Sequence, residues 1–295
     1  MSELRQLVAE ELSLPVDPRV AAMAQAIAAR HGEASRAVLF YGSCLRQSEL
    51  DGLMLDFYLI VSDYRAAYDK RWLAVANRLV PPNVFYFEHG GLVAKYAVLS
   101  ETDFAQECST KATSTSVWAR FAQPSRLVWR ADERAGDAVI DTVAEAGPTL
   151  FALTRPAMSG RCVNPLDIFR AGFTLTYGAE LRAERKGRSI SIVDADRPRF
   201  QRFGEAIIRE REFQAARGRK AARRAWRNRQ RKGKLLSIAR LAKASAPFAG
   251  GADYIAWKIN RHAGTQIELK PWQRRWPLFA ALTLLPRLLR SGAVR

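Results

Sequence analysis

The chain has 295 residues, of which 48% are hydrophobic and 26% are charged. This balance is typical of a globular protein rather than a disordered one, and the length leaves room for two domains. The 47 Lys and Arg residues against 29 Asp and Glu residues give a net charge of +18. Such a charge predicts attraction to a polyanion: nucleic acid, anionic lipid or a phosphorylated substrate.

Cysteine spacing and hydropathy argue against several other classes of protein. Cys44, Cys108 and Cys162 show no CxxC spacing, which argues against a disulfide framework or a zinc site and indicates a reducing compartment. No segment reaches the roughly 18 uninterrupted apolar residues of a spanning helix. The first eleven residues contain three glutamates and no apolar core, so we do not expect a secretory signal.

The first 130 residues alternate helix and strand signals. Asp17 is suited to cap a helix that Gly32 ends near residue 31. Apolar runs separated by turn residues predict four strands, and Ser100 is suited to cap a following helix. The predicted strands span residues 37–41, 55–61, 84–88 and 93–99, with a hairpin turn at 89–91.

The pattern becomes mainly helical from about Asp132. Phe169, Phe173 and Tyr177 recur every four residues in a helix predicted over 167–186. Residues 189–193 fit either a short strand or part of a turn. We therefore predict an α/β (α+β) fold, with a mixed-sheet domain over 1–130, a helical domain over 131–205 and a basic region over 206–295.

The first predicted strand ends at Gly42-Ser43, and the second one begins beside Asp56. Glycine lets backbone N–H groups approach a phosphate, and serine adds a hydroxyl donor. A carboxylate on the neighbouring strand suits Mg²⁺, which prefers oxygen ligands. This order of strand, Gly-Ser, loop, acid and strand resembles the polymerase-beta-like nucleotidyltransferase superfamily.

The motif departs from that superfamily in one respect. Its members usually carry two acids separated by one residue, whereas the first of these positions is Met54 here. Asp51 is the nearest substitute in sequence. Glu88, at the end of the third predicted strand, is suited either to a later metal-binding acid or to a plain surface role.

Further motifs resemble the mitochondrial-type (translocator assembly and maintenance) phosphatidate cytidylyltransferases. They occur in the same order as in that family and cover roughly residues 37–203. The matching segments are Tyr41-Gly42-Ser43, Met54-Leu55-Asp56-Phe57, Lys95-Tyr96-Ala97-Val98, Arg120 to Pro124, and Leu175 to Arg182, where Glu180 replaces an aspartate.

This resemblance implies that CTP reacts with phosphatidic acid, in the presence of Mg²⁺, to give CDP-diacylglycerol and pyrophosphate. It implies catalytic roles for Asp56 and Lys95, and metal binding by Asp56 and Glu88. The implied nucleotide-binding residues are Gly42, Ser43, Arg120, Tyr177, Glu180 and Arg182. Glu180, Arg182 and Arg120 are equally suited to structural ion pairs. For Lys95, a solvated strand position is the alternative, and the resemblance favours the functional role.

The C-terminal third adds a strongly basic run. Residues 217–234 hold ten Lys and Arg residues and no acid, which suits anionic lipid or, as an alternative, nucleic acid. Tryptophans at 272 and 276, followed by a leucine-rich stretch with arginines, are typical of an interfacial amphipathic segment. A core-packing terminal helix is the competing interpretation.

The sequence therefore predicts a cytoplasmic enzyme of phospholipid biosynthesis, peripheral on the inner face of the membrane. Its expected partners are CTP, phosphatidic acid and an anionic membrane surface. Two alternatives stay open: a nucleotidyltransferase with a soluble or RNA acceptor, and an inactive nucleotidyltransferase fold that serves as a membrane or RNA adaptor.

Overall fold

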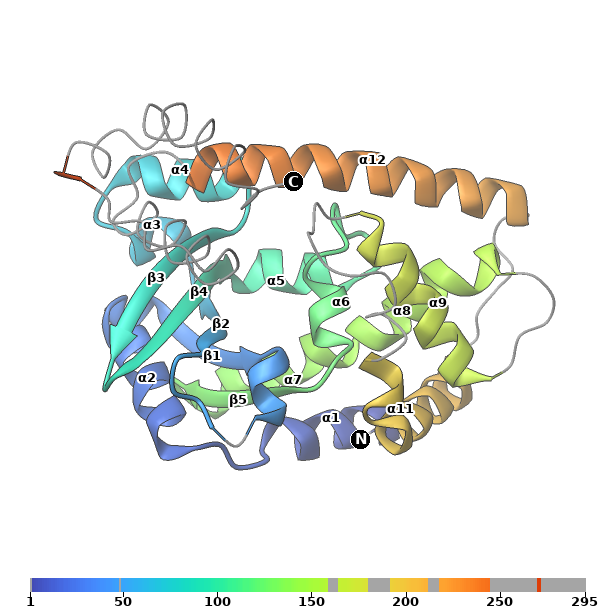
Figure 1. Cartoon of the computed structure of the whole chain (residues 1–295), viewed down its shortest axis with the longest axis horizontal. Coiled ribbons are helices and arrows are strands. Elements are labelled where there is room, and N and C mark those ends of the chain that lie inside the picture. Colours follow the sequence, from blue (N-terminus) through green and yellow to red (C-terminus); the bar gives the residue numbers. More distant parts are fainter. Residues whose placement is uncertain are drawn as a thin grey trace.

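The computed structural model describes residues 2–47, 49–158, 164–179, 192–211, 218–244 and 270–271. A five-stranded sheet in the order β3-β4-β2-β1-β5 lies beside a group of helices, and one long helix runs along both parts (Figure 1). The strands are β1 (Ser35–Tyr41), β2 (Met54–Val61), β3 (Asn83–His89), β4 (Leu92–Ser100) and β5 (Ser125–Arg130).

The sheet confirms the predicted α/β class and all four predicted strands. β2 and β4 are parallel, while β3–β4, β1–β2 and β1–β5 are antiparallel. The turn between β3 and β4 contains Gly90 and Gly91, both with positive φ, as the predicted hairpin requires. β5 was not predicted; its half-buried residues follow the Arg120 segment directly and form the edge beside β1.

Helices cover both faces of the sheet. α2 and α4 belong to the buried cluster on one face, and α5 and α7 to the cluster on the other. The described helices are α1 (Glu3–Leu12), α2 (Pro18–Ala29), α3 (Tyr64–Ala67), α4 (Arg71–Leu79), α5 (Glu101–Cys108), α6 (Trp118–Phe121), α7 (Glu133–Ala144), α8 (Ala146–Thr154), α9 (Pro165–Tyr177), α11 (Arg197–Glu210) and α12 (Arg219–Ala244).

The two predicted caps are present. The backbone N–H of Arg19 donates to the Asp17 carboxylate at 2.8 Å, and that of Asp103 donates to the Ser100 hydroxyl at 3.1 Å. The predicted helix over 167–186 is seen as α9, but it ends at Tyr177, since Gly178 and Ala179 form a turn. Residues 180–186 fall outside the described residues. Ile192 and Val193 lie in a helical turn, so the strand interpretation of 189–193 is wrong for these two residues.

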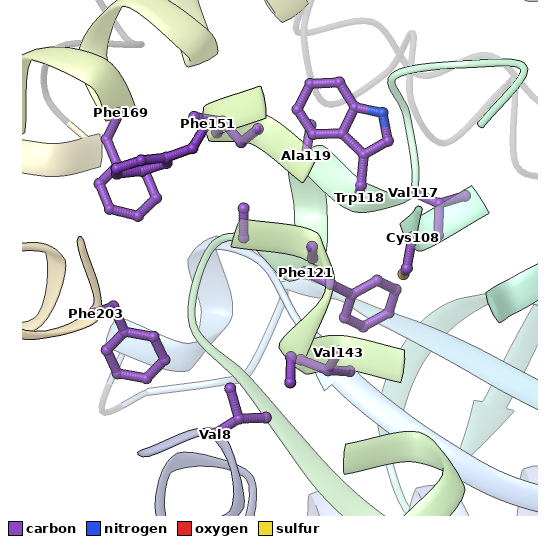
Figure 2. Packing of buried hydrophobic residues seen from close by; sticks show 14 of the residues in the cluster. Val8, Cys108, Val117, Trp118, Ala119, Phe121, Val143, Phe151, Phe169 and Phe203 are labelled. Carbon is purple, nitrogen blue, oxygen red and sulfur yellow. The ribbon is translucent and has the colours of Figure 1, made fainter. Parts of the chain in front are cut away.

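One buried cluster joins the sheet to the helical part of the chain. It extends from Leu39 and Tyr58 in the sheet to Phe169 in α9, Phe203 in α11 and Trp226 in α12. Figure 2 shows Phe151 and Phe169 in contact within it. Their rings are arranged edge to face, with the ring centroids 4.9 Å apart. The core thus crosses the boundary predicted at residue 130, and a division into domains stays a prediction from the sequence.

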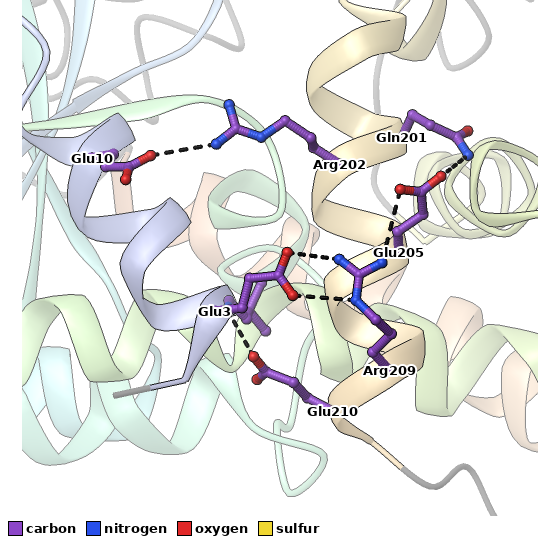
Figure 3. Close-up of polar contacts among 8 residues, drawn as sticks. Glu3, Glu10, Gln201, Arg202, Glu205, Arg209 and Glu210 are labelled. Carbon is purple, nitrogen blue, oxygen red and sulfur yellow. Dashed lines mark hydrogen bonds and ion pairs between the residues drawn. The ribbon is translucent and has the colours of Figure 1, made fainter.

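Ion pairs attach the first helix to α11, far along the chain (Figure 3). Arg209 contacts Glu3 at 2.6 Å, and the backbone N–H of Leu4 donates to Glu210 at 2.9 Å. Exposed pairs of this kind contribute little to stability. The ion pair between Arg199 and Glu11 differs in its burial. Both side chains are nearly buried, and the Arg199 Nε is 2.6 Å from the Glu11 Oε2.

The basic run predicted over 217–234 falls mostly in α12, a helix of 26 residues. Trp226 anchors this helix: it is buried, its indole N–H donates to the carbonyl of Leu153 at 2.7 Å, and its ring meets Trp118 edge to face. Gln230 adds a hydrogen bond to the carbonyl of Leu175 at 3.1 Å. The basic helix therefore packs onto the core through Trp226 and Gln230.

Replacing Trp226 with alanine should destabilise the protein by about 3–5 kcal/mol, because it removes a fully buried ring and leaves a cavity. Arg227 is exposed on the next position of the same helix, so Arg227→Ala is the matched control and should change stability by less than about 0.5 kcal/mol. Urea unfolding curves of the two variants test this. Equal stability of both would show that α12 is not anchored by Trp226.

Candidate functional site

The pairing of β2 with β4 determines the centre of the candidate site. Asp56 of β2 lies directly beside Lys95 of β4 in the parallel register, and Tyr41 of β1 lies opposite Asp56 on its other side. Residues paired in this way point to the same face of the sheet. The Lys95 Nζ is 3.0 Å from the Asp56 Oδ1, and both side chains are about one quarter to one third exposed.

The Gly42-Ser43 turn lies against the same carboxylate. Gly42 has φ +98°, in the region that favours glycine. A Cβ added at Gly42 would be 3.3 Å from the Asp56 Oδ2, so any side chain there would crowd the carboxylate. Ser43 is exposed and begins the short 3-10 helix η2 (Ser43–Arg46). The structure thus brings together four of the predicted site residues.

Tyr41 and Arg120 extend the site toward α6. Burial raises the pKa of the Tyr41 hydroxyl well above its ordinary value, and the negative charge of Asp56 raises it further. The charge of Arg120 and its hydrogen bond to Tyr41 oppose this rise. Tyr41 was part of the predicted motif without an assigned role. Its hydroxyl group lies within the electrostatic reach of both charged groups and stays protonated at neutral pH.

Arg120 is in turn connected to the basic helix α12. It donates a hydrogen bond to the carbonyl of Ser116, and the hydroxyl of Ser116 accepts one from Arg240 at 3.0 Å. Arg240 also donates to the carbonyl of Pro81 at 2.7 Å. No sequence signal separated Arg240 from the other basic residues nearby, because its role depends on the packing of α12 over the sheet domain.

In the part of the chain that the structure describes, few acids lie near Asp56. Met54 lies two residues before Asp56 in β2, on the same face, and it is buried. Glu88 pairs with Val93 of β4 and receives a hydrogen bond from the Tyr86 hydroxyl; β4 lies between it and β2, so the structure does not bring the two predicted metal ligands together. Asp51 contacts Arg19 of α2 at 2.9 Å. Among the described residues, no three His, Cys, Asp or Glu side chains are grouped to hold a metal ion.

The remaining predicted residues lie elsewhere or are not described. Tyr177 ends α9, which packs against α8 and α11, and its half-buried side chain contacts the core there. Glu180 and Arg182 lie outside the described residues. The described helices include none long and apolar enough to cross a membrane.

Comparison with known proteins adds little to this geometry. No protein-family profile matches the chain, and no curated protein matches it. Among solved structures, it is similar to a nucleotidyltransferase-like protein from Exiguobacterium sibiricum 255-15, with 12% identity over 92% of each chain and a TM-score of 0.29. At that TM-score the match carries no argument about function, and the site is judged on its own residues.

The crowding at Gly42 gives a direct test of the site's geometry. Gly42→Ala places a Cβ on a residue with φ +98° and ψ −164°, a backbone region that is essentially restricted to glycine and costs other residues about 1–3 kcal/mol. Gly91→Ala, at φ +77° with nothing within 4 Å of its Cβ, controls for an alanine at positive φ that meets no neighbouring side chain. We expect Gly42→Ala to be the more destabilising, because it also displaces Asp56. Urea unfolding measures the difference; an equal loss in both would separate Gly42 from the carboxylate.

Proposed function

We propose that this protein is a nucleotidyltransferase that transfers a cytidylyl group from CTP to phosphatidic acid, with Mg²⁺. The observation that carries the proposal is the contact of three features on one sheet face: the Gly42-Ser43 turn, the Asp56 carboxylate and the Lys95 ammonium. A turn without a side chain leaves room for a phosphate, and the two charged groups suit a metal ion and a phosphate oxygen.

The residues present fit one magnesium ion bound mainly through the nucleotide. Mg²⁺ in such sites is usually held by one or two protein carboxylates together with substrate phosphates and water. Asp56 supplies one carboxylate, and its Oδ2 faces the Gly42 turn while its Oδ1 contacts Lys95. When bound, the ion would neutralise charge on the triphosphate and polarise the α-phosphate.

The proposed reaction needs no strong general base. An oxygen of the lipid phosphate, already an anion, forms a bond to the α-phosphorus of CTP, and the bond from that phosphorus to the bridging oxygen breaks to release pyrophosphate. Negative charge develops on the phosphate oxygens, and fixed cations stabilise it. Lys95, which contacts Asp56, can take this role, and the Tyr41 hydroxyl, which stays protonated, can donate a hydrogen bond in the same place.

The acceptor is proposed from two features of the chain. A lipid phosphate is supported by the ordered resemblance to the phosphatidate cytidylyltransferases and by the basic helix α12, which contains eleven Lys and Arg residues and no acid. A polyanionic surface suits that helix. CTP and phosphatidic acid are therefore proposed as the substrate pair, and a membrane surface as the place of reaction.

A second candidate function is nucleotide binding without catalysis. Asp56 already contacts Lys95 at 3.0 Å, and Met54 stands where a second acid would lie. A site of this kind can hold a triphosphate through Lys95 and the Gly42-Ser43 turn without activating it. This candidate predicts calorimetric binding of CTP by the wild type and no product.

The proposed activity is tested with radiolabelled CTP, phosphatidic acid in detergent micelles and Mg²⁺. Asp56→Asn should lower kcat/KM by about 100-fold or more, the scale of losing one preorganised charged group. Asp51→Asn is the matched control, because Asp51 is an exposed acid in the turn just before β2 and pairs with Arg19 instead. It should retain the wild-type rate.

Each other outcome has a clear meaning. Equal rates for Asp56→Asn and wild type would remove Asp56 from the mechanism. No label in lipid, but label in a soluble or RNA acceptor, would replace phosphatidic acid as the substrate while keeping nucleotidyl transfer. Tight CTP binding with no transfer to any acceptor would favour the second candidate.

A further inference from the structure

Helix α4 presents an apolar stripe to solvent. It packs against the sheet domain through Ala74 and Asn77, which are buried. On the opposite side, Trp72, Val75 and Leu79 are 45%, 57% and 74% exposed. These residues are three and four positions apart, so they lie along one face of the helix. Large apolar side chains gathered in this way on a surface mark an interaction site.

The C-terminal part of α12 carries a second set of exposed apolar side chains. Leu235 and Ile238 are 66% and 54% exposed. This part of α12 is held to the loop that follows α4, because Arg240 donates to the carbonyl of Pro81, and Lys243 donates to that of Pro82 at 2.8 Å. α4 and the end of α12 therefore lie at the same end of the molecule (Figure 1). We call Trp72, Val75, Leu79, Leu235 and Ile238 the α4/α12 patch.

Positive charge surrounds the α4/α12 patch. Arg71 and Arg78 flank the stripe on α4, and both are exposed. On α12, the exposed face changes along the helix from basic to apolar. Its basic members are Lys220, Arg224, Arg227 and Arg231. Exposed apolar side chains at the end of a basic, acid-free helix are the composition of surfaces that insert shallowly into anionic bilayers.

We propose that the α4/α12 patch docks the protein onto an anionic lipid bilayer, with the aliphatic side chains entering the headgroup region and the basic face of α12 lying over the lipid phosphates. The proposal deepens the proposed function and rests on it for its purpose, since a lipid phosphate substrate is met at such a surface. Binding itself does not require turnover, so it is measured separately.

Other occupants fit the patch less well. A second copy of the chain would bring one acid-free, basic helix toward another, and like charges repel. Residues 245–295, which follow α12 in the chain, carry eight Lys and Arg residues against two acids, so their net positive charge also opposes binding to a basic surface. Nucleic acid would match the charge but makes little use of exposed Val75, Leu79, Leu235 and Ile238, since bases stack on aromatic side chains.

The test is flotation of the full chain with phosphatidylcholine vesicles, with and without phosphatidylglycerol. The wild type should float only with the anionic vesicles. The double variants Val75→Ser/Leu79→Ser and Leu235→Ser/Ile238→Ser should each bind those vesicles about tenfold more weakly, because they remove apolar contact with the bilayer. Leu14→Ser is the matched control: Leu14 is 49% exposed outside the patch, and its variant should bind as the wild type does.

The outcomes separate docking from catalysis and from other partners. Both double variants should keep full cytidylyl transfer to phosphatidic acid dispersed in detergent, where no bilayer is needed. Vesicle binding equal to that of Leu14→Ser would overturn the docking proposal and leave the activity untouched. Loss of a dimer in light scattering, with vesicle binding unchanged, would assign the patch to a second copy. Loss of RNA binding, again with unchanged vesicle binding, would assign it to nucleic acid.

Discussion

The parallel pairing of β2 with β4 is the constraint on which the candidate site depends. It places Asp56 and Lys95 in register on one sheet face, with Tyr41 on the antiparallel neighbour. A shift of one residue in that ladder would turn Lys95 to the opposite face, among the buried residues Ala94 and Tyr96. The apolar neighbours of these residues therefore hold the two charges together, since any other register would bury a charge without its partner.

The sequence predicted those parts of the site that depend on local pattern. Gly42, Ser43, Asp56 and Lys95 each sit at or within a strand whose apolar run is visible in the chain, so their positions on one sheet could be inferred. Glu88 shows the limit of this reasoning. Its strand was predicted, but only the strand order shows that β4 lies between Glu88 and Asp56.

Features that depend on tertiary packing were not accessible in the same way. The contact of Arg240 with Ser116 joins residues 124 positions apart, and nothing local distinguishes Arg240 from the other arginines of α12. The apolar residues of α4 pose the reverse problem. A helix with Trp72, Val75 and Leu79 on one face is typical of core packing, whereas here the small and polar residues Ala74 and Asn77 face the protein.

The ion pair between Asp56 and Lys95 also bears on how the site would accept its substrates. In the absence of ligands, each charge compensates the other, which limits the penalty of holding them partly away from water. In the proposed reaction, a positively charged metal ion and a negatively charged triphosphate would bind at this pair of charges. Asp56 would then hold the metal and Lys95 a phosphate oxygen, so that two favourable contacts would replace one. The ion pair would thus stabilise the site without ligands, and its two side chains would bind the metal and the triphosphate when both are present. A lone Asp56 carboxylate beside Met54 would have no positive partner in the empty site and would offer no cation to the phosphate.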